Sequence, residues 1–271
     1  MNKHADPLKC PRCGAGGSLA IQPGSLNVEY VVCESCGHAL PITWGVPNFA
    51  EDINAQTTKL PLTQKIMETR LFAKIYETPV WRPLHTYIST GKSVQAQLEE
   101  MLALSGDHPR DVVLDLACGT GHFTRAFAKN WPDANLYGLD LSFSMLREAV
   151  SRAKKDELDN VVFIRGSIFD LPFLDNTIDH VNCCGALHLF QDQPTIWKEI
   201  SRILKPGGLF TGEAIAIDPK VEKIQRVVEK SRGASFIQPE VFRAQLQDVG
   251  LESMEHTQRK VIMTFRSVKA E

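Results

Sequence analysis

The stretch from Val112 to Gly121 reads Val-Val-Leu-Asp-Leu-Ala-Cys-Gly-Thr-Gly, and it constrains the fold of this chain more than any other segment. Its apolar start predicts a buried strand, and the small-residue loop that follows lets the backbone come close to a ligand. Glycine suits such a loop because it adopts unusual dihedral angles and has no Cβ to block that approach. An amphipathic run from His122 predicts a helix, so the sequence indicates a strand–loop–helix unit at a ligand site.

A strand–helix rhythm continues from this unit to the C-terminus. Apolar runs that alternate with amphipathic segments and short loops predict a doubly wound α/β fold on a mostly parallel sheet. The last two apolar runs are separated only by a short turn, so those strands must pair antiparallel. The expected strands cover 112–116, 135–139, 161–165, 178–183, 209–217, 251–256 and 259–267, and the expected helices cover 122–129, 142–155, 194–204 and 238–249.

Four cysteines near the N-terminus form two Cys-x2-Cys knuckles, each followed by a glycine. A two-residue gap places both sulfurs of a pair on one side of a tight turn, and two pairs make a tetrahedral set of four thiolates. Such a closed set suits structural Zn²⁺ and leaves no open position for catalysis. With strands expected at 28–32 and 39–43, the sequence predicts a small zinc ribbon whose ligands are Cys10, Cys13, Cys33 and Cys36.

Residues 51–105 are expected to form a helical connector between the zinc ribbon of 1–50 and the α/β domain of 106–271. Apolar residues recur at helical spacing over 66–75, and a further helix is expected over 93–104. Between them lies an aromatic segment, 76–87, in which Pro79 and Pro83 are expected to interrupt any helix. This segment either bridges the domains by packing or forms a lid, with Tyr76 as the residue that would touch the ligand.

The bulk properties of the chain exclude some classes of function. Its formal net charge of -2 gives no global basic field for nucleic acid. No apolar run approaches the roughly 18 residues of a membrane-spanning helix, and the first residues lack the apolar core of a signal peptide. We therefore expect a cytoplasmic protein, in which the seven cysteines stay reduced.

Two ligands compete for the loop at 115–121. A dinucleotide site has the pattern Gly-x-Gly-x-x-Gly, but the position that follows Gly119 and Gly121 in this pattern is Thr124. S-adenosylmethionine has no pyrophosphate; it needs a close backbone loop, an acid for the ribose hydroxyls, and polar and apolar groups around adenine. Asp140 can supply that acid, because it ends the second strand 19 residues after Gly121. The order of these residues favours S-adenosylmethionine.

Several segments of the chain resemble class I S-adenosylmethionine-dependent methyltransferases, in particular the type-11 group that includes quinone C-methyltransferases. The matching segments are 114–121, 138–142, 166–173, 186–188 and 204–208, within a region that covers about 110–271. The resemblance implies a seven-stranded sheet of order 3-2-1-4-5-7-6 whose last strand is antiparallel. Residues 40–49 are similar to the end of the Trm-type zinc ribbons that accompany methyltransferases.

The resemblance also implies which residues hold the cofactor. Two positions depart from the family pattern: Ala117 replaces the first motif glycine, and Ser167 replaces the aspartate that would make a charge-assisted hydrogen bond to adenine. Asp170 is a candidate to compensate for that loss. The expected cofactor-binding residues are Asp115, Ala117, Cys118, Gly119, Gly121, Asp140, Leu141, Met145, Ser167, Ile168 and Tyr76.

Methyl transfer depends on alignment and a dry site, because the cofactor itself carries the reactive methyl group. A general base is needed only if the acceptor must lose a proton, and His188, after the fourth strand, is the best candidate. His188 can equally serve to pack or orient its loop. Cys183 and Cys184 are expected to be buried wall thiols rather than nucleophiles, because their neighbours are apolar and no base accompanies them.

Three functions fit these observations. The first is methyl transfer to a small-molecule acceptor, such as a quinone or a secondary metabolite, favoured by the near-neutral charge and the aromatic segment. The second is methylation of a ribosomal RNA base, with the ribbon gripping RNA; against it, residues 1–50 balance three basic residues with three acidic ones. The third is a non-catalytic scaffold whose ribbon recruits a partner, an alternative that the departure at Ser167 keeps open.

Overall fold

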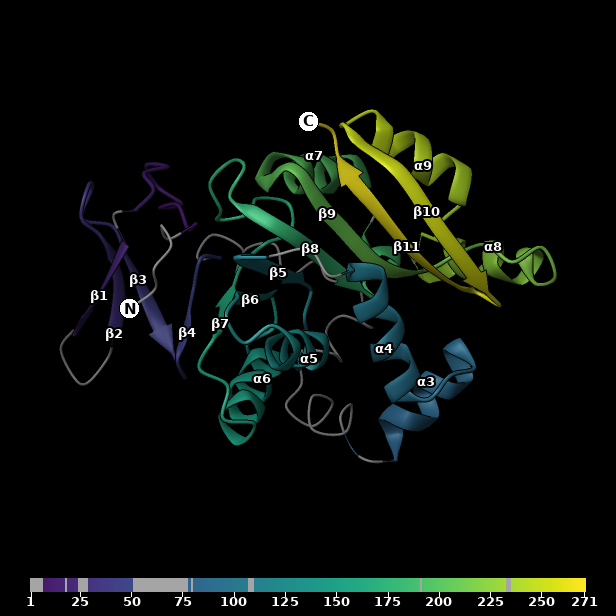
Figure 1. Ribbon diagram of the computed structural model, residues 1–271, viewed down its shortest axis with the longest axis horizontal. Coiled ribbons are helices and arrows are strands. Elements are labelled where there is room, and N and C mark those ends of the chain that lie inside the picture. The colour runs from purple at the N-terminus through teal and green to yellow at the C-terminus, as the bar shows by residue number, and fades with distance from the viewer. Residues whose placement is uncertain are drawn as a thin grey trace.

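A small four-stranded sheet lies beside a larger seven-stranded sheet in the computed structural model (Figure 1). The structure describes residues 7–17, 19–23, 29–50, 78, 80–106, 110–190, 192–232 and 235–271. The helix expected over 66–75, together with Tyr76 and Pro79, lies outside these described residues. Among the described residues, no helix is both long enough and apolar enough to cross a membrane.

The large sheet has the strand order β10-β11-β9-β8-β5-β6-β7. Counted along the chain from its first strand, this is the predicted order 3-2-1-4-5-7-6, and β11 pairs antiparallel with both of its neighbours. The strands are β5 (Val112–Leu116), β6 (Asn135–Asp140), β7 (Val161–Arg165), β8 (Ile178–Cys184), β9 (Leu204–Ile215), β10 (Leu251–Arg259) and β11 (Ile262–Lys269). The fold class expected from the sequence is thereby confirmed.

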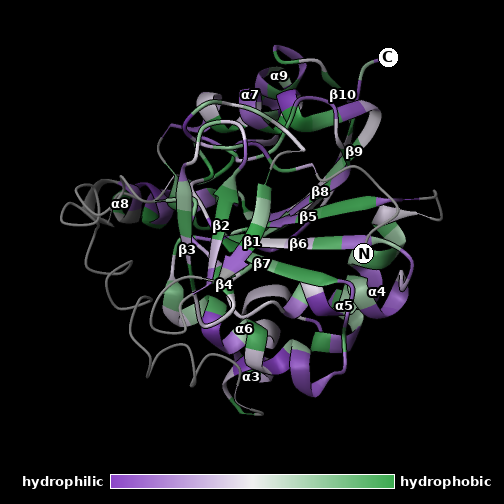
Figure 2. Cartoon of the chain, turned by 90° about the vertical axis from the view of Figure 1, so that its left-hand side faces the viewer, coloured by the Kyte–Doolittle hydropathy of each residue, from purple (hydrophilic) through white to green (hydrophobic). Residues whose placement is uncertain are grey.

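Helices cover both faces of this sheet, as the doubly wound pattern requires (Figure 1). One face carries α4 (Val94–Ser105), which packs on β9 and β11, α5 (His122–Asn130) and α6 (Phe143–Lys155). The other face carries α7 (Gln193–Ile203) and α9 (Pro239–Gln247). The short helix η4 (Leu187–Leu189) follows β8, and α8 (Glu222–Arg232) follows β9. Because both faces are covered, β5 and β7 are apolar along most of their length (Figure 2).

The helix α3 (Trp81–Thr90) corrects one expectation from the sequence, because Pro83 lies inside it. Pro83 is the third helical residue, and an amide at that position has no intrahelical carbonyl to donate to. The missing N–H therefore costs nothing there, and the helix continues to a left-handed C-cap at Gly91. The next helix, α4, lies within one residue of the predicted range at each end and is capped by Ser93.

The small sheet contains the strands β1 (Leu19–Pro23), β2 (Glu29–Cys33), β3 (Ala39–Thr43) and β4 (Val46–Pro47), paired antiparallel in that order. The sequence indicated β2 and β3 but not β1 and β4. This N-terminal sheet joins the large one at its β7 edge, where the amide of Phe49 donates to the carbonyl of Arg165. Val46 is fully buried with Leu146 and Phe163, so the two sheets share packed apolar surface.

Candidate cofactor site and metal centre

The loop after β5 adopts the left-handed backbone that its glycines permit. Gly119 and Gly121 have φ of 56° and 72°, and Ala117 has φ of 51°. A Cβ on Gly121 would lie 2.8 Å from a ring carbon of Phe163, so the close approach of α5 to β7 requires glycine there. Ala117 adopts the same region without being glycine, which costs free energy. The family's preference for glycine at this position thus has a direct cause in the backbone.

Asp140 ends β6 and closes onto this loop. One of its carboxylate oxygens accepts the amide of Gly119 at 2.8 Å, and the other accepts the amide of Ser142, also at 2.8 Å. Ser142 caps α6 by accepting the amide of Met145, whose side chain is buried. The structure thus brings Asp140, the predicted ribose acid, together with Gly119 of the loop and with the start of α6. Leu141 lies between them and offers its carbonyl oxygen to Arg165.

Asp115 is buried at the end of β5 and anchors a chain of polar side chains. Its carboxylate accepts Thr124 at 2.6 Å and Asn182 at 2.7 Å. Thr211 of β9 donates to Asn182 at 3.2 Å, and His180 lies 2.7 Å from the Thr211 hydroxyl. Burial raises the pKa of Asp115 to about 6, against the hydrogen bonds from Thr124 and Asn182, which lower it. Asp115 therefore titrates near neutral pH beneath the glycine loop.

Cys118 lies between these two acids. Its Sγ would lie 3.1 Å from a Cβ added to Gly138, so it fills the space above β6. Burial and the nearby carboxylates of Asp140 and Asp115 raise the pKa of its thiol well above the usual range. Cys118 is thus a neutral wall group of the loop at pH 7, not a thiolate.

The loop after β7 holds Ser167 by a local contact. The Ser167 hydroxyl accepts the amide of Phe169 at 3.2 Å, which is a local turn contact. Ile168 beside it is buried and packs in the main core. Asp170, considered as a substitute for the missing aspartate, is mostly exposed and lies 4.0 Å from Lys9 of the N-terminal segment. The ionic contact of Asp170 is therefore with Lys9 of the N-terminal segment.

His188 lies in η4, directly after β8. Burial lowers its pKa to about 4, so the imidazole is neutral at pH 7. Within the described part of the chain its Nδ1 is buried and has no hydrogen-bond partner. Cys183 and Cys184 line the end of β8, and burial raises the pKa of both thiols. Both are therefore neutral thiols in the wall of the site, as expected, and not nucleophiles.

Three polar contacts in and around the site were not anticipated from the sequence. Gln97 of α4 donates to Glu213 of β9 at 2.6 Å, and burial raises the pKa of Glu213 to about 7. The chain from His180 to Asn182 is the second, and the contact of Arg165 with the N-terminal sheet is the third. Each contact joins residues far apart in sequence or buries a polar group in an apolar strand. A single sequence carries no pattern that indicates such pairs.

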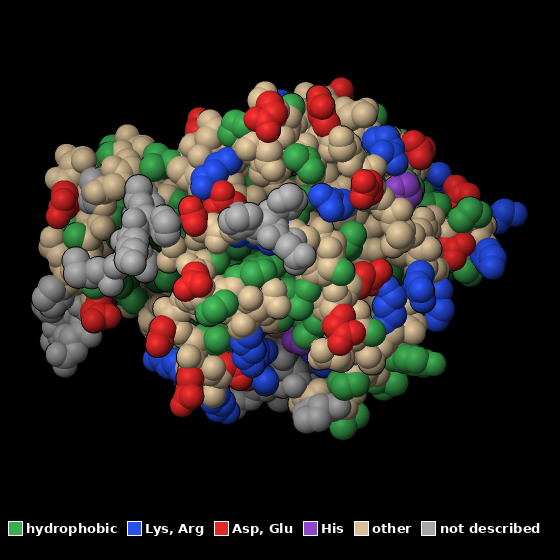
Figure 3. Space-filling model, in the orientation of Figure 1, with side chains coloured by type: hydrophobic (Ala, Val, Ile, Leu, Met, Phe, Trp, Pro, Cys, Tyr) green, Lys and Arg blue, Asp and Glu red, His purple; other side chains and the backbone are tan. Residues whose placement is uncertain are grey.

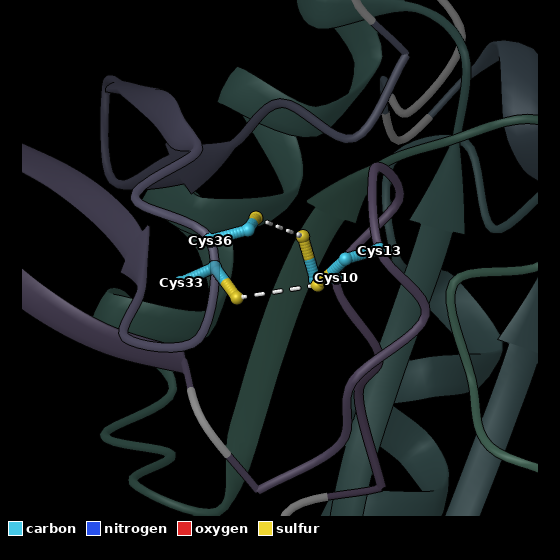
Figure 4. A group of neighbouring side chains, drawn as sticks. All are labelled: Cys10, Cys13, Cys33 and Cys36. Carbon is cyan, nitrogen blue, oxygen red and sulfur yellow. Dashed lines mark hydrogen bonds between the residues drawn. The ribbon is translucent and has the colours of Figure 1, made fainter.

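The four N-terminal cysteines converge at the other end of the molecule. Their sulfur atoms all lie within 4.8 Å of one another, and they point inward from two knuckle turns (Figure 4). The sulfurs of Cys10 and Cys36, and those of Cys13 and Cys33, are 3.7 Å apart. Gly14 and Gly37 follow the knuckles with positive φ, and their amides close the two turns. Four converging thiols, with no oxygen ligand among them in the described part of the chain, suit a tetrahedral, thiolate-binding metal ion.

Comparison with known proteins identifies the central part of the chain. Residues 113–208 match a family model described as a methyltransferase domain. These residues run from the first strand of the large sheet through the glycine loop, Asp140 and His188. Residues 113–208 thus carry a methyltransferase domain. The strand order of the large sheet is the one that the resemblance to class I methyltransferases implies.

Relatives by sequence include an uncharacterized chloroplastic methyltransferase of Arabidopsis thaliana, 27% identical over 230 residues, which cover 78% of this chain and 62% of that protein. A demethylmenaquinone methyltransferase of a Geobacillus strain is 41% identical over 96 residues, covering 35% of this chain and 41% of that protein. The chain thus spans less than two thirds of the length of either relative, and the higher identity extends over only 96 residues.

Solved structures share the fold at low identity. Phosphoethanolamine N-methyltransferase 2 of Haemonchus contortus, solved with S-adenosylhomocysteine, has a TM-score of 0.63 at 18% identity, covering 77% of this chain and 59% of that one. A chain from the complex of the Haloferax volcanii Trm112 methyltransferase activator with a methyltransferase has a TM-score of 0.57 at 21% identity, covering 74% of this chain and 97% of that one. At these identities the likeness shows the fold alone.

Proposed function

We propose that this protein transfers a methyl group from S-adenosylmethionine to a small-molecule acceptor. The observation that carries the proposal is the contact between Asp140 and the glycine loop, since Asp140 accepts the amides of Gly119 and Ser142. This contact holds a carboxylate at the end of the second strand, where an acid can accept both ribose hydroxyls. The methyltransferase domain match and the neighbour solved with S-adenosylhomocysteine support the same cofactor.

The residues around this contact fit the parts of the cofactor. The positive-φ loop of Ala117, Gly119 and Gly121 would bring the backbone close to the methionine end, and buried Asp115 offers a carboxylate below it. Leu141, Met145, Ser167 and Ile168 would surround the ribose and adenine, with Tyr76 as the proposed lid contact. When bound, the cofactor supplies a sulfonium methyl group; the protein aligns the reactants and excludes water.

The proposed acceptor is quinone-like. The demethylmenaquinone methyltransferases among the relatives support this class, with identities of 32% to 41% over parts of their chains. Basic and acidic side chains also alternate over the face shown in Figure 3, instead of forming one basic track for RNA. We place His188 near the acceptor as a neutral polar contact, because a pKa of about 4 makes it a weak base at pH 7.

We also propose that Cys10, Cys13, Cys33 and Cys36 hold one structural Zn²⁺. The convergence of four sulfurs with no oxygen or nitrogen ligand among the described residues supports a closed site without catalytic chemistry. None of the seven cysteines forms a disulfide, which fits the reducing cytoplasm that we propose as the compartment.

The test of the cofactor site is calorimetry with S-adenosylmethionine on the wild type, on Asp140→Ala and on Asp133→Ala, an exposed acid outside the site. We expect Asp140→Ala to weaken binding about tenfold or more, because hydrogen bonds to a charged group are lost. Asp133→Ala should bind like the wild type. Equal affinity of all three proteins would refute the assignment of Asp140.

The acceptor class is tested by offering small-molecule and RNA fractions of cell extract with labelled S-adenosylmethionine. Label in the small-molecule fraction is the expected result. Label in RNA, together with tight binding that weakens as salt increases, would favour the RNA alternative. Binding of S-adenosylmethionine without turnover of any fraction would favour the scaffold alternative.

A further inference from the structure

Glu213 is a buried acid on the strand next to β8, and neither the cofactor loop nor the zinc ribbon uses it. It is 5% exposed, and its register partner across the parallel pair is Cys184. Its carbonyl accepts the amide of Gly185, the first residue of the loop that carries His188. Glu213 therefore lies at the edge of the sheet where the parallel strands end, one strand beyond the cofactor site.

The side chain of Glu213 faces α4 and the β10–β11 turn. A small cavity of about 10 Å³ lies there, lined by Glu213 together with Lys92, Arg259 and Thr264 among others. Because β11 runs antiparallel to β9, its first residues lie at the edge where β8 and β9 end. A cavity of this volume has room for roughly one water-sized group. It fits a hydroxyl better than a larger polar group.

Gln97 can hydrogen-bond to Glu213 in either protonation state of the Glu213 carboxyl group. Its amide nitrogen donates to a carboxylate oxygen of Glu213 at 2.6 Å. Gln97 is 7% exposed, and within the described part of the chain its amide oxygen is buried without a hydrogen-bond partner. If Glu213 is protonated, a rotated Gln97 amide can accept a hydrogen bond from the carboxyl O–H through that oxygen. The pair is thus compatible with both protonation states.

The charges around Glu213 set the pH at which it ionises. The pKa of Glu213 is raised to about 7, chiefly by burial and in part by the charge of Glu100 in α4, while the hydrogen bond from Gln97 and the charges of Lys92 and Arg82 act to lower it. Lys92 is paired with Glu100, and Arg259 of β10 also lines the cavity. A carboxyl group with a pKa near 7 can take up a proton at neutral pH. The cations beside it can stabilise the anion that remains on the group that gave up the proton.

We propose that Glu213, held by Gln97, is the general base that takes the proton from a hydroxyl group of a phenol- or hydroquinone-type acceptor. The acceptor O–H bond breaks, an O–H bond forms on Glu213, and the electron pair stays on the acceptor oxygen, which makes the acceptor a stronger nucleophile for the methyl group. The proton then passes from Glu213 to solvent. This inference rests on the proposed methyl transfer and names its acceptor class.

The test measures binding of two probes to the full chain saturated with S-adenosylhomocysteine, under anaerobic conditions. One probe is 1,4-dihydroxynaphthalene and the other is 1,4-dimethoxynaphthalene, which has no hydroxyl proton. We expect the wild type to prefer the dihydroxy probe at least tenfold at pH 8 and to lose this preference below pH 7. Glu213→Gln should lose the preference at every pH, while Glu213→Asp should keep part of it.

Gln97→Leu gives an independent readout that a merely structural role of Glu213 would not move. Removal of the Gln97 hydrogen bond disfavours the carboxylate, so the midpoint of the pH dependence should rise above that of the wild type. Affinity for S-adenosylhomocysteine should stay unchanged in every variant, which also checks folding.

The inference is overturned if Glu213→Gln keeps the preference, or if the wild type binds both probes equally or neither of them while still binding S-adenosylhomocysteine. Failure of the wild type to bind S-adenosylhomocysteine would instead refute the proposed function itself.

Discussion

The guanidinium of Arg165 donates from Nε to the carbonyl oxygen of Leu141 at 2.8 Å. Arg165 ends β7 and is 6% exposed, and Leu141 directly follows the ribose acid Asp140. A second nitrogen of Arg165 lies 3.3 Å from the side-chain oxygen of Asn48 in the N-terminal segment. Its guanidinium also stacks on Phe143 at the start of α6, with 4.6 Å to the ring centre. One buried side chain thus joins the N-terminal segment to the backbone beside Asp140.

We predict that Arg165→Leu weakens S-adenosylmethionine binding several-fold and lowers the free energy of unfolding by about 2–3 kcal/mol, because hydrogen bonds from a buried charged donor are lost. Calorimetry and urea denaturation measure the two effects. The matched control is Asn48→Ala, which removes the contact with the N-terminal segment and leaves Arg165 bonded to Leu141. If Arg165→Leu and Asn48→Ala weaken cofactor binding equally, the contact with Leu141 has no special role.

A second prediction concerns the metal. Purified protein should contain about one zinc ion per chain, and Cys13→Ser should lose most of it, because a tetrahedral thiolate site tolerates few substitutions. The loss should lower the melting temperature, since the N-terminal sheet packs on β7 and α6 through Val46. Elemental analysis and calorimetric melting give the two readouts. The control is Cys184→Ser, a thiol outside the cluster, which should keep its zinc; a full zinc content in Cys13→Ser would contradict the proposed site.

How far the sequence predicted this molecule depends on the range over which each feature is encoded. The doubly wound α/β class follows from alternating apolar and amphipathic runs, and the cysteine knuckles follow from local spacing. Both are patterns within short segments, and the structure has both, whereas the order of the seven strands was implied only by the resemblance to methyltransferases. The position of Asp140 at the end of a strand is likewise a local property, and the structure places it against the glycine loop.

The contacts that the sequence did not predict are long-range. Gln97 and Glu213 are 116 residues apart, and Arg165 and Asn48 are 117 residues apart. Such pairs form only after the helices pack on the sheet, so no local propensity indicates them. Pro83 shows the opposite error. The rule that proline interrupts a helix was applied without knowing where the helix begins, and proline is tolerated at the third helical residue.

A third prediction follows from the backbone of Ala117. Its φ of 51° is costly for any residue with a Cβ, so Ala117→Gly should stabilise the protein by up to about 1 kcal/mol, the strain relieved minus the extra entropy of glycine when unfolded. Urea denaturation measures the change. Ala103→Gly, at an exposed position in α4, is the control and should destabilise by about 1 kcal/mol. A destabilised Ala117→Gly would mean that the Ala117 methyl group makes contacts worth more than the strain.

The last prediction concerns the pH dependence that Asp115 confers. Its pKa is about 6 in the folded chain against an ordinary value of 3.8, so between these pH values the folded protein holds a proton that the unfolded chain has lost. The resulting stabilisation is complete below about pH 4 and is lost as the pH rises through 6. Cofactor binding should show the opposite trend, because only the ionised carboxylate attracts a cationic ligand.

We therefore expect S-adenosylmethionine affinity to rise about tenfold between pH 5 and 7, while the stability of the ligand-free protein falls over the same interval. Asp115→Asn should flatten both curves, since its amide can still bond to Thr124 and Asn182 without titrating. Calorimetric binding and denaturation at matched pH values measure the two trends. If the pH dependence of either curve survives in Asp115→Asn, another group is responsible for that curve, and the burial of Asp115 does not set it.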